Sequence, residues 1–142
     1  GDYEPNTGDK NRSHVRGFVG YQYKKFNIGA EVFQQQQQNA GGTDVDIVPF
    51  GLSAYVWGTL YAKKDKPVLN AFARFDIYDP DTKNDTLGYK ENFTSAGLDY
   101  MPIDNVHFMP NVWVNSYSGK TSSLAEKKAD VVARMTFYYV YR

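Results

Sequence analysis

Apolar residues occupy every second position over long stretches of the chain, and the spacing of three to four residues that marks a helix is almost absent. Strict alternation over such lengths is typical of β-strands with two unlike faces. The alternation predicts strands near 14–24, 26–34, 47–61, 68–78, 91–101, 105–117 and 129–142. The fold class that follows is all-β, with seven antiparallel strands joined up and down in chain order.

The two faces of these strands differ sharply in charge. The face with the apolar positions has 36 residues and none of them is charged, whereas a chain with 23% charged residues would place about eight there by chance. Most stretches span nine or more residues. Strands of soluble sheets have about 5 to 6 residues, and tilted strands that cross a membrane have about 9 to 11. One face is therefore uncharged over a length that matches a lipid bilayer.

The connections between the strands alternate between short and long. Short turns are expected at 24–25, 63–67 and 102–104, and long polar loops at 34–46, 79–90 and 117–128. The apolar positions change from odd numbers ending at Tyr23 to even numbers starting at Phe26, as a two-residue hairpin requires. The glutamine run 34–38 is predicted to continue the second strand as a solvated polar extension.

This arrangement resembles the single-chain outer-membrane β-barrels of Gram-negative bacteria, and among them the general porins, from about Arg12 to Arg142. In that family an apolar belt faces lipid, a polar face lines the lumen, short turns are periplasmic and long loops are extracellular. The segment 135–142 is similar to the family's terminal strand, which carries alternating aromatics. It ends on Arg142 where an aromatic is usual, so one further residue is expected.

The resemblance implies a transmembrane β-barrel in the bacterial outer membrane, with a periplasmic C-terminus and contacts to outer-membrane lipid and lipopolysaccharide. The lumen would be lined by Arg16, Lys24, Glu31, Arg74, Asp76, Asp99, Asn111, Asp130 and Arg134. Aromatic girdles at the two membrane interfaces would contain Tyr21, Tyr23, Phe26, Phe50, Phe75, Tyr100, Phe108, Tyr139 and Tyr141. The lumen charges balance, so no strong ion preference is predicted, and cross-strand ion pairing is the simpler role for them.

Seven strands cannot close a bacterial barrel, because such barrels have an even number of strands and need about eight. We therefore expect 1–142 to be a single C-terminal segment of a larger barrel, whose remaining strands lie on another chain or on a missing segment. Loss of one earlier strand is the alternative. Residues 1–13 are interpreted as the tail of an extracellular loop. A homo-oligomer is compatible with the same pattern.

Composition excludes several other classes of function. The 16 basic and 16 acidic residues balance to zero, whereas nucleic-acid binding needs an excess of positive charge. The absence of cysteine excludes disulfide scaffolds and thiolate metal sites. The sequence has no run of about 18 apolar residues, which a transmembrane helix requires. No secretory signal is recognisable at its beginning.

One acidic segment invites a metal-binding interpretation. Asp79, Asp81 and Asp85 are spaced like the first ligands of a calcium loop. That loop needs glycine at its sixth position and glutamate at its twelfth, and the chain has Asn84 and Lys90 there. We therefore predict a solvated surface loop and no metal site.

The sequence shows no catalytic machinery. His14 and His107 have no partner at metal spacing, and no nucleophile motif such as G-x-S-x-G is present. A pair of His107 with Ser95 on the neighbouring strand is a remote alternative. Pro110 interrupts the sixth strand and predicts a local bulge. We therefore expect neither an enzyme nor a cofactor.

Three functions remain. The first is a porin that forms a passive diffusion channel for small hydrophilic solutes or ions. The second is a plugged barrel with a structural or surface-binding role and no channel activity. The third is a soluble β-barrel or sandwich that turns the uncharged face inward around an apolar ligand. Strand length and the alternation of short and long connections favour the first two.

Overall fold

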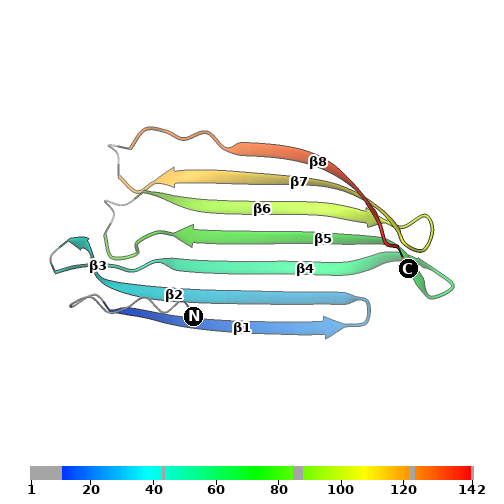
Figure 1. Cartoon of the computed structure of the whole chain (residues 1–142), viewed down its shortest axis with the longest axis horizontal. Helices are drawn as coiled ribbons and strands as arrows, with labels where there is room; N and C mark the ends of the chain where they lie inside the picture. The colour runs from blue at the N-terminus through cyan, green and yellow to red at the C-terminus, as the bar shows by residue number, and fades with distance from the viewer. Residues whose placement is uncertain (1–10, 43, 85–87, 122–123, 142) are drawn as a thin grey trace.

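The computed structural model describes residues 11–42, 44–84, 88–121 and 124–141, which form eight strands. The strands are β1 (Arg12–Tyr23), β2 (Phe26–Gly42), β3 (Val45–Ile47), β4 (Phe50–Lys63), β5 (Lys66–Asp79), β6 (Tyr89–Tyr100), β7 (Val106–Gly119) and β8 (Asp130–Tyr139). All pairings are antiparallel, and the order across the sheet is β1-β2-β4-β5-β6-β7-β8, with β3 paired to β2 (Figure 1). The prediction of an all-β, up-and-down antiparallel fold is confirmed.

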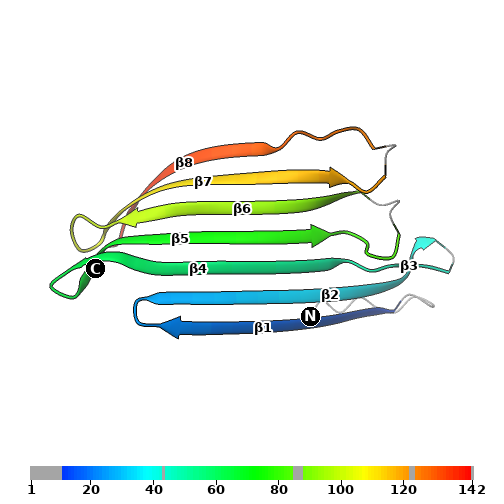
Figure 2. The same cartoon turned by 180° about the vertical axis from the view of Figure 1, so that it is seen from behind.

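The sheet is a single open layer with β1 and β8 at its edges. Figures 1 and 2 show the same layer from its two sides, and no other described element covers either face. The described strands do not close into a barrel on their own. Within the described residues no helix is long and apolar enough to cross a membrane.

The strand register separates the two faces as the alternation predicts. One row across the sheet contains Val19, Ala30, Ala54, Phe75, Thr94, Val114 and Val131. The adjacent row contains Phe18, Glu31, Ser53, Asp76, Phe93, Asn115 and Asp130. The first row belongs to what we call the apolar face and the second to the polar face. A shift of one residue in any strand would mix them, so the seven long strands share one register across these rows.

The apolar face is the more exposed of the two. In β6, Thr94, Ala96, Leu98 and Tyr100 are exposed, whereas their neighbours on the polar face are half-buried. Large apolar side chains such as Val15 and Met135 are 74% and 67% exposed. Val48 is the only buried hydrophobic residue in the described part of the chain. The sheet therefore has almost no hydrophobic core and leaves its apolar face exposed.

The predicted third strand, 47–61, is wrong in one respect because it is divided in two. The N–H of Val48 is bonded to Asp81 Oδ1 at 3.0 Å and its carbonyl accepts the N–H of Thr82 at 2.8 Å, so neither group joins a ladder. Pro49 follows and has no N–H to donate. The chain thus has a short β3 before β4, which raises the strand number from the predicted seven to eight.

The predicted loop at 34–46 is also wrong, because most of it is strand. β2 continues past the expected end at 34 to Gly42 and pairs with β3 through Gln37 and Ile47. The predicted polar extension at 34–38 is therefore part of the sheet, because residues 34–37 pair with residues 12–15 of β1 and Gln37 also pairs with Ile47 of β3. The other two long connections, after β5 and after β7, are confirmed as loops where the structure describes them.

Two of the short turns are two-residue hairpins. Tyr23 pairs with Phe26, which confirms the turn predicted at 24–25, and Lys63 pairs with Lys66. Lys64 and Asp65 have φ angles of 50° and 64°. Positive φ at both central residues is the requirement of a type I′ turn, which suits the twist of the flanking strands.

Two local details differ from strict alternation. The β4–β5 register shifts around Leu60, where Thr59 pairs with Asn70 and Tyr61 with Leu69. The bulge predicted at Pro110 is wrong, since the pairs of β6 and β7 keep one register on both sides of it. The ladder is only interrupted there, because proline cannot donate a backbone hydrogen bond.

Candidate functional site: the polar face of the sheet

Two ion pairs mark the polar face between β1 and β5. Arg16 Nε lies 2.6 Å from Glu31 Oε1, which joins β1 to β2. Arg74 Nε lies 2.8 Å from Asp76 Oδ2 on the same strand, β5. The first pair joins two strands, as expected from the sequence. The second pair lies within one strand, where residues i and i+2 point to the same face and can contact each other.

The other residues predicted to line a lumen make individual contacts. Asp99 accepts from His107, Asp130 accepts from the Tyr117 hydroxyl at 2.6 Å, and Arg134 lies 5.8 Å from the centre of the Trp113 ring. Asn111 Nδ2 donates to the Met109 carbonyl at 3.2 Å. Lys24 lies in the turn just beyond β1, with Nζ 5.1 Å from the centre of the Tyr23 ring. All of these except Lys24 belong to strand positions on the polar face.

A chain of polar side chains crosses β4 to β7 near the short turns. Thr59 Oγ1 donates to Asn70 Oδ1 at 2.9 Å, and Asn70 Nδ2 reaches Asp99 Oδ2 at 3.4 Å. Asp99 Oδ1 lies 2.8 Å from His107 Nδ1. Asn70 is only 4% exposed, and its amide provides both a donor and an acceptor to this chain. His107 therefore contacts the Asp99 carboxylate. Ser95, its alternative partner from the sequence, lies opposite Arg74 and Trp113 in the strand register.

Aromatic rings on the polar face lie over glycines of the neighbouring strands. A Cβ built on Gly51 would fall 2.2 Å from the Phe33 ring, and one on Gly29 would fall 2.4 Å from the Tyr55 ring. Both pairs are direct cross-strand partners. The rings thus occupy the space that a side chain would take, which flattens this face and explains part of the high aromatic content.

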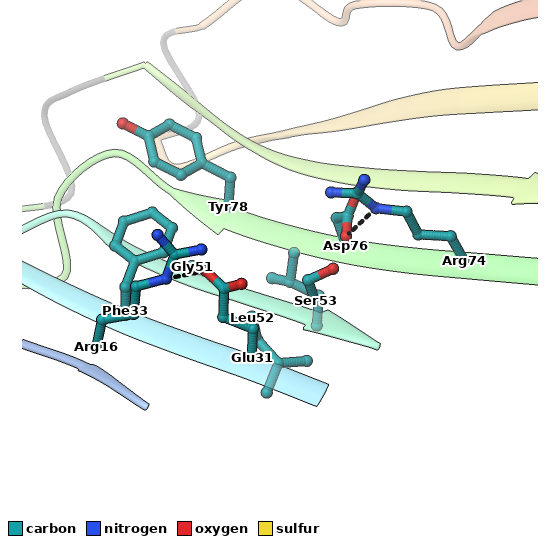
Figure 3. Close-up of a pocket in the computed structure, with 10 residues that line it drawn as sticks. Arg16, Glu31, Phe33, Gly51, Leu52, Ser53, Arg74, Asp76 and Tyr78 are labelled. Atoms are coloured by element: carbon teal, nitrogen blue, oxygen red, sulfur yellow. Dashed lines mark hydrogen bonds and ion pairs between the residues drawn. The ribbon is translucent and has the colours of Figure 1, made fainter. Parts of the chain in front are cut away.

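A groove with a volume of about 460 Å³ lies between the two ion pairs (Figure 3). Its walls come from β1, β2, β4 and β5. The residues that line it are Arg16, Glu31, Phe33, Gly51, Leu52, Ser53, Arg74, Asp76, Ile77 and Tyr78. Sequence reasoning identified the four charged residues and missed Phe33, Tyr78 and Gly51. The available signal was that an aromatic and a glycine stand opposite each other on adjacent predicted strands.

Side chains at the opposite end from the short turns form a second polar cluster. We call it the loop-end cluster, and it contains Asp46, Asp79, Asp81, Lys83, Asn84, Lys90 and Lys120. Lys120 Nζ lies 2.8 Å from Asp79 Oδ1, and its side chain is only 1% exposed. Lys120 also donates to the carbonyls of Asp81 and Asn84. The loops after β5 and β7 are therefore tied together.

The prediction of a solvated loop at Asp79 and Asp81 is wrong. These residues are 6% and 0% exposed, because each carboxylate is surrounded by donors. Asp85, the third acidic residue of that segment, lies outside the described residues. In the described part of the chain no three His, Cys, Asp or Glu side chains are placed to hold a metal ion. Lysine and backbone N–H groups occupy the place that a cation would take.

The pKa of Asp81 follows from these contacts. Burial of the carboxyl opposes ionisation, but hydrogen bonds from the Val48 N–H, the Asn84 amide and the Lys83 N–H outweigh it. The pKa of the Asp81 carboxyl is therefore lower than its ordinary value. The Asp81 carboxylate is therefore ionised and hydrogen-bonded at neutral pH.

The residues predicted as aromatic girdles lie on the apolar face. Tyr23 pairs with Phe26 beside a short turn, and Tyr100 pairs with Phe108 near another. The rings of Tyr139 and Tyr141 are 4.7 Å apart. Toward the loop end, Phe50 pairs with Gln34 and Phe75 with Ala54, and Tyr21 pairs with Ile28 near the first turn. Several of these rings, including Tyr21, are more than half exposed.

Comparison of the chain with protein-family models, with curated proteins and with solved structures finds no match. The functional argument therefore depends on the chemistry of the two faces.

Proposed function

We propose that this chain is part of the wall of an outer-membrane porin, a passive diffusion channel for small hydrophilic solutes and ions. The observation that carries the proposal is the exposed apolar face, whose central rows, from that of Val32 and Leu52 to that of Phe26 and Gly58, contain no charged residue. A soluble protein rarely exposes so large a continuous apolar surface, because its transfer to water is unfavourable. Contact with lipid acyl chains removes that cost.

The same proposal accounts for the open edges of the sheet. Backbone amide and carbonyl groups in hydrocarbon must all be hydrogen-bonded, so a sheet spans lipid only when it closes. β1 and β8 lack a further strand among the described residues. The remaining strands, on another chain or on a further segment of this protein, would pair with both edges. The polar face, with its ion pairs, would then line a water-filled lumen.

The orientation in the membrane follows from the ends of the sheet. The turns between β1 and β2, β4 and β5, and β6 and β7 lie at one end, where the chain also finishes after β8 (Figure 1). The longer connections lie at the other end. In outer-membrane barrels short turns are periplasmic and long loops are extracellular. The proposal places the loop-end cluster at the cell surface, next to lipopolysaccharide, and the C-terminus in the periplasm.

The test is conductance through a planar lipid bilayer, measured with the complete barrel that contains this chain. A porin produces stepwise increases in current as single channels insert. A bilayer that stays silent, with protein shown to be inserted, contradicts the channel. Protein that remains monodisperse in buffer without detergent contradicts membrane insertion and supports a soluble β-fold instead. The detergent solution without protein is the matched control.

A second candidate is a plugged barrel that binds partners at the cell surface. The loop-end cluster favours it, because the buried pair of Lys120 and Asp79 fixes two loops that a simple pore does not need to order. The same bilayer measurement separates the two candidates, since a plugged barrel inserts without conducting. Binding of surface ligands to such a barrel would depend on Lys120, whereas conductance would not.

A further inference from the structure

The groove between Arg16 and Arg74 has two parallel rows of side chains with different chemistry. The register places Phe33, Gly51 and Tyr78 in one row and Glu31, Ser53 and Asp76 in the next. β4 runs through the middle and contributes two polar-face residues to the groove, Ser53 and Gly51, and the Phe33 ring lies over Gly51. Aromatic rings border one row and carboxylates border the other (Figure 3).

Both arginines make the shortest contact of their ion pair at Nε and remain largely exposed. Arg16 contacts Glu31 through Nε, and Arg74 contacts Asp76 through Nε. The two arginine side chains are 61% and 56% exposed, while the carboxylates are 28% and 23% exposed. Each arginine therefore presents N–H donors next to a carboxylate that accepts hydrogen bonds. Glu31 and Asp76 are separated by β4, so their strands stand about 10 Å apart.

We infer that this groove binds a neutral saccharide. Each hydroxyl of a sugar donates one hydrogen bond and accepts others, which matches a guanidinium beside a carboxylate. The C–H face of a sugar ring is apolar and packs against a flat aromatic ring, here Tyr78 or Phe33. The volume of about 460 Å³ lies within the range of small-molecule sites, about 300 to 1,000 Å³.

The charge balance of the groove favours a neutral ligand over an ion. Two guanidinium groups and two carboxylates add up to no net charge, and each charge already has a partner. An anion would have to compete with Glu31 and Asp76, and a cation with Arg16 and Arg74. A neutral sugar leaves both ion pairs intact and uses only their remaining donors and acceptors.

The inference rests on the proposed function, because the polar face must be in contact with water and solutes. Two measurements distinguish saccharide binding from channel activity. Calorimetric titration of the complete barrel in detergent micelles with raffinose, a neutral trisaccharide, measures binding without any need for a channel. Addition of raffinose to single channels in a bilayer measures block of the current. We expect saturable binding in the first and a concentration-dependent block in the second.

Two variants test the two rows of the groove. Tyr78→Leu removes the ring and keeps an apolar side chain, so raffinose binding weakens severalfold. Glu31→Gln with Asp76→Asn removes both acceptor carboxylates and leaves two unpaired guanidinium groups. We expect raffinose affinity to fall about tenfold or more and binding of inorganic phosphate to appear. Trp113→Leu, which removes a polar-face aromatic outside the groove, is the matched control and leaves raffinose affinity unchanged.

The outcomes separate the saccharide site from the channel. Conductance without raffinose binding overturns the site and leaves the channel in place. Raffinose binding without conductance supports the site and contradicts the channel. Binding of phosphate by the unaltered protein in preference to raffinose overturns the site as a neutral one. Equal loss of raffinose affinity in Trp113→Leu overturns its location, and circular dichroism of each variant verifies that the sheet is formed.

Discussion

Asp81 is a carboxylate with no exposed surface, held by the N–H groups of Val48 and Lys83 and by the Asn84 amide. A buried carboxylate is stable only when donors replace the water that it loses. These three donors come from the segment before β4 and from the loop after β5, so one side chain connects two stretches that are distant in sequence. Its ionisation is therefore coupled to the order of both.

Acidification should release this connection. The pKa of Asp81 in the folded protein is lower than its ordinary value of 3.8, so its contribution to stability is fully present above that value. That contribution decreases as the pH falls through the lower pKa of the folded state. We expect amide hydrogen exchange at Val48 and Lys83 to accelerate in strong acid, while the centre of β6 stays protected. Asp81→Asn should show fast exchange at neutral pH already. A carboxyl titration above 3.8, measured by NMR, contradicts this account.

At the scale of the elements, alternation was sufficient to predict the seven long strands, their order and their faces. It could not predict the break at Val48, because the partner of that residue is a side chain 33 positions away. The burial of Lys120 was unpredictable for the same reason, since its partners belong to another loop. The charged residues of the groove were predictable from alternation, whereas the position of Phe33 over Gly51 depends on the register between two strands.

Gly51→Ala tests whether that ring holds β2 and β4 together. The new Cβ would lie 2.2 Å from Phe33 Cε1, so the ring must move away. We expect a loss of about 1 to 3 kcal/mol in the free energy of unfolding, the usual cost of overpacking. The matched change is Gly17→Ala, whose nearest side-chain atom would be Val32 Cγ1 at 3.8 Å, an ordinary contact. It should be neutral or slightly stabilising, because glycine is unfavourable in a strand. Urea titration of the barrel in micelles measures both, and equal effects contradict a role for the ring.

At the scale of the whole molecule, the sheet reverses the usual distribution of side chains in a folded protein, in which apolar side chains are buried and polar ones are exposed. Many large apolar side chains are exposed, and three of the four buried side chains other than glycine and proline in the described residues, those of Asn70, Asp79 and Asp81, are polar. Burial of apolar area in water therefore cannot supply the main driving force for this fold. The stability must come from the ladder hydrogen bonds, from ion pairs on the polar face and from a surrounding that solvates the apolar face. In the porin proposal, a lipid bilayer is the environment that solvates the apolar face, and the closed barrel pairs the remaining backbone groups.

Two neighbouring residues of β8 allow this reversal to be tested with matched charges. Met135 lies on the apolar face opposite Pro110, and Thr136 lies on the polar face opposite Met109. Met135→Arg places a charge in hydrocarbon and should lower the free energy of unfolding in lipid vesicles by about 2 to 4 kcal/mol. Thr136→Arg places the same charge in the wetted lumen and should change it by no more than about 0.5 kcal/mol. Denaturant titrations of the complete barrel in the same vesicles measure both values.

Because the two sites are adjacent on one strand, strand propensity and the cost of inserting an arginine are shared, and only the face differs. If Thr136→Arg proved the more harmful of the two, the apolar face would have to look inward, and the channel would be excluded together with the saccharide site.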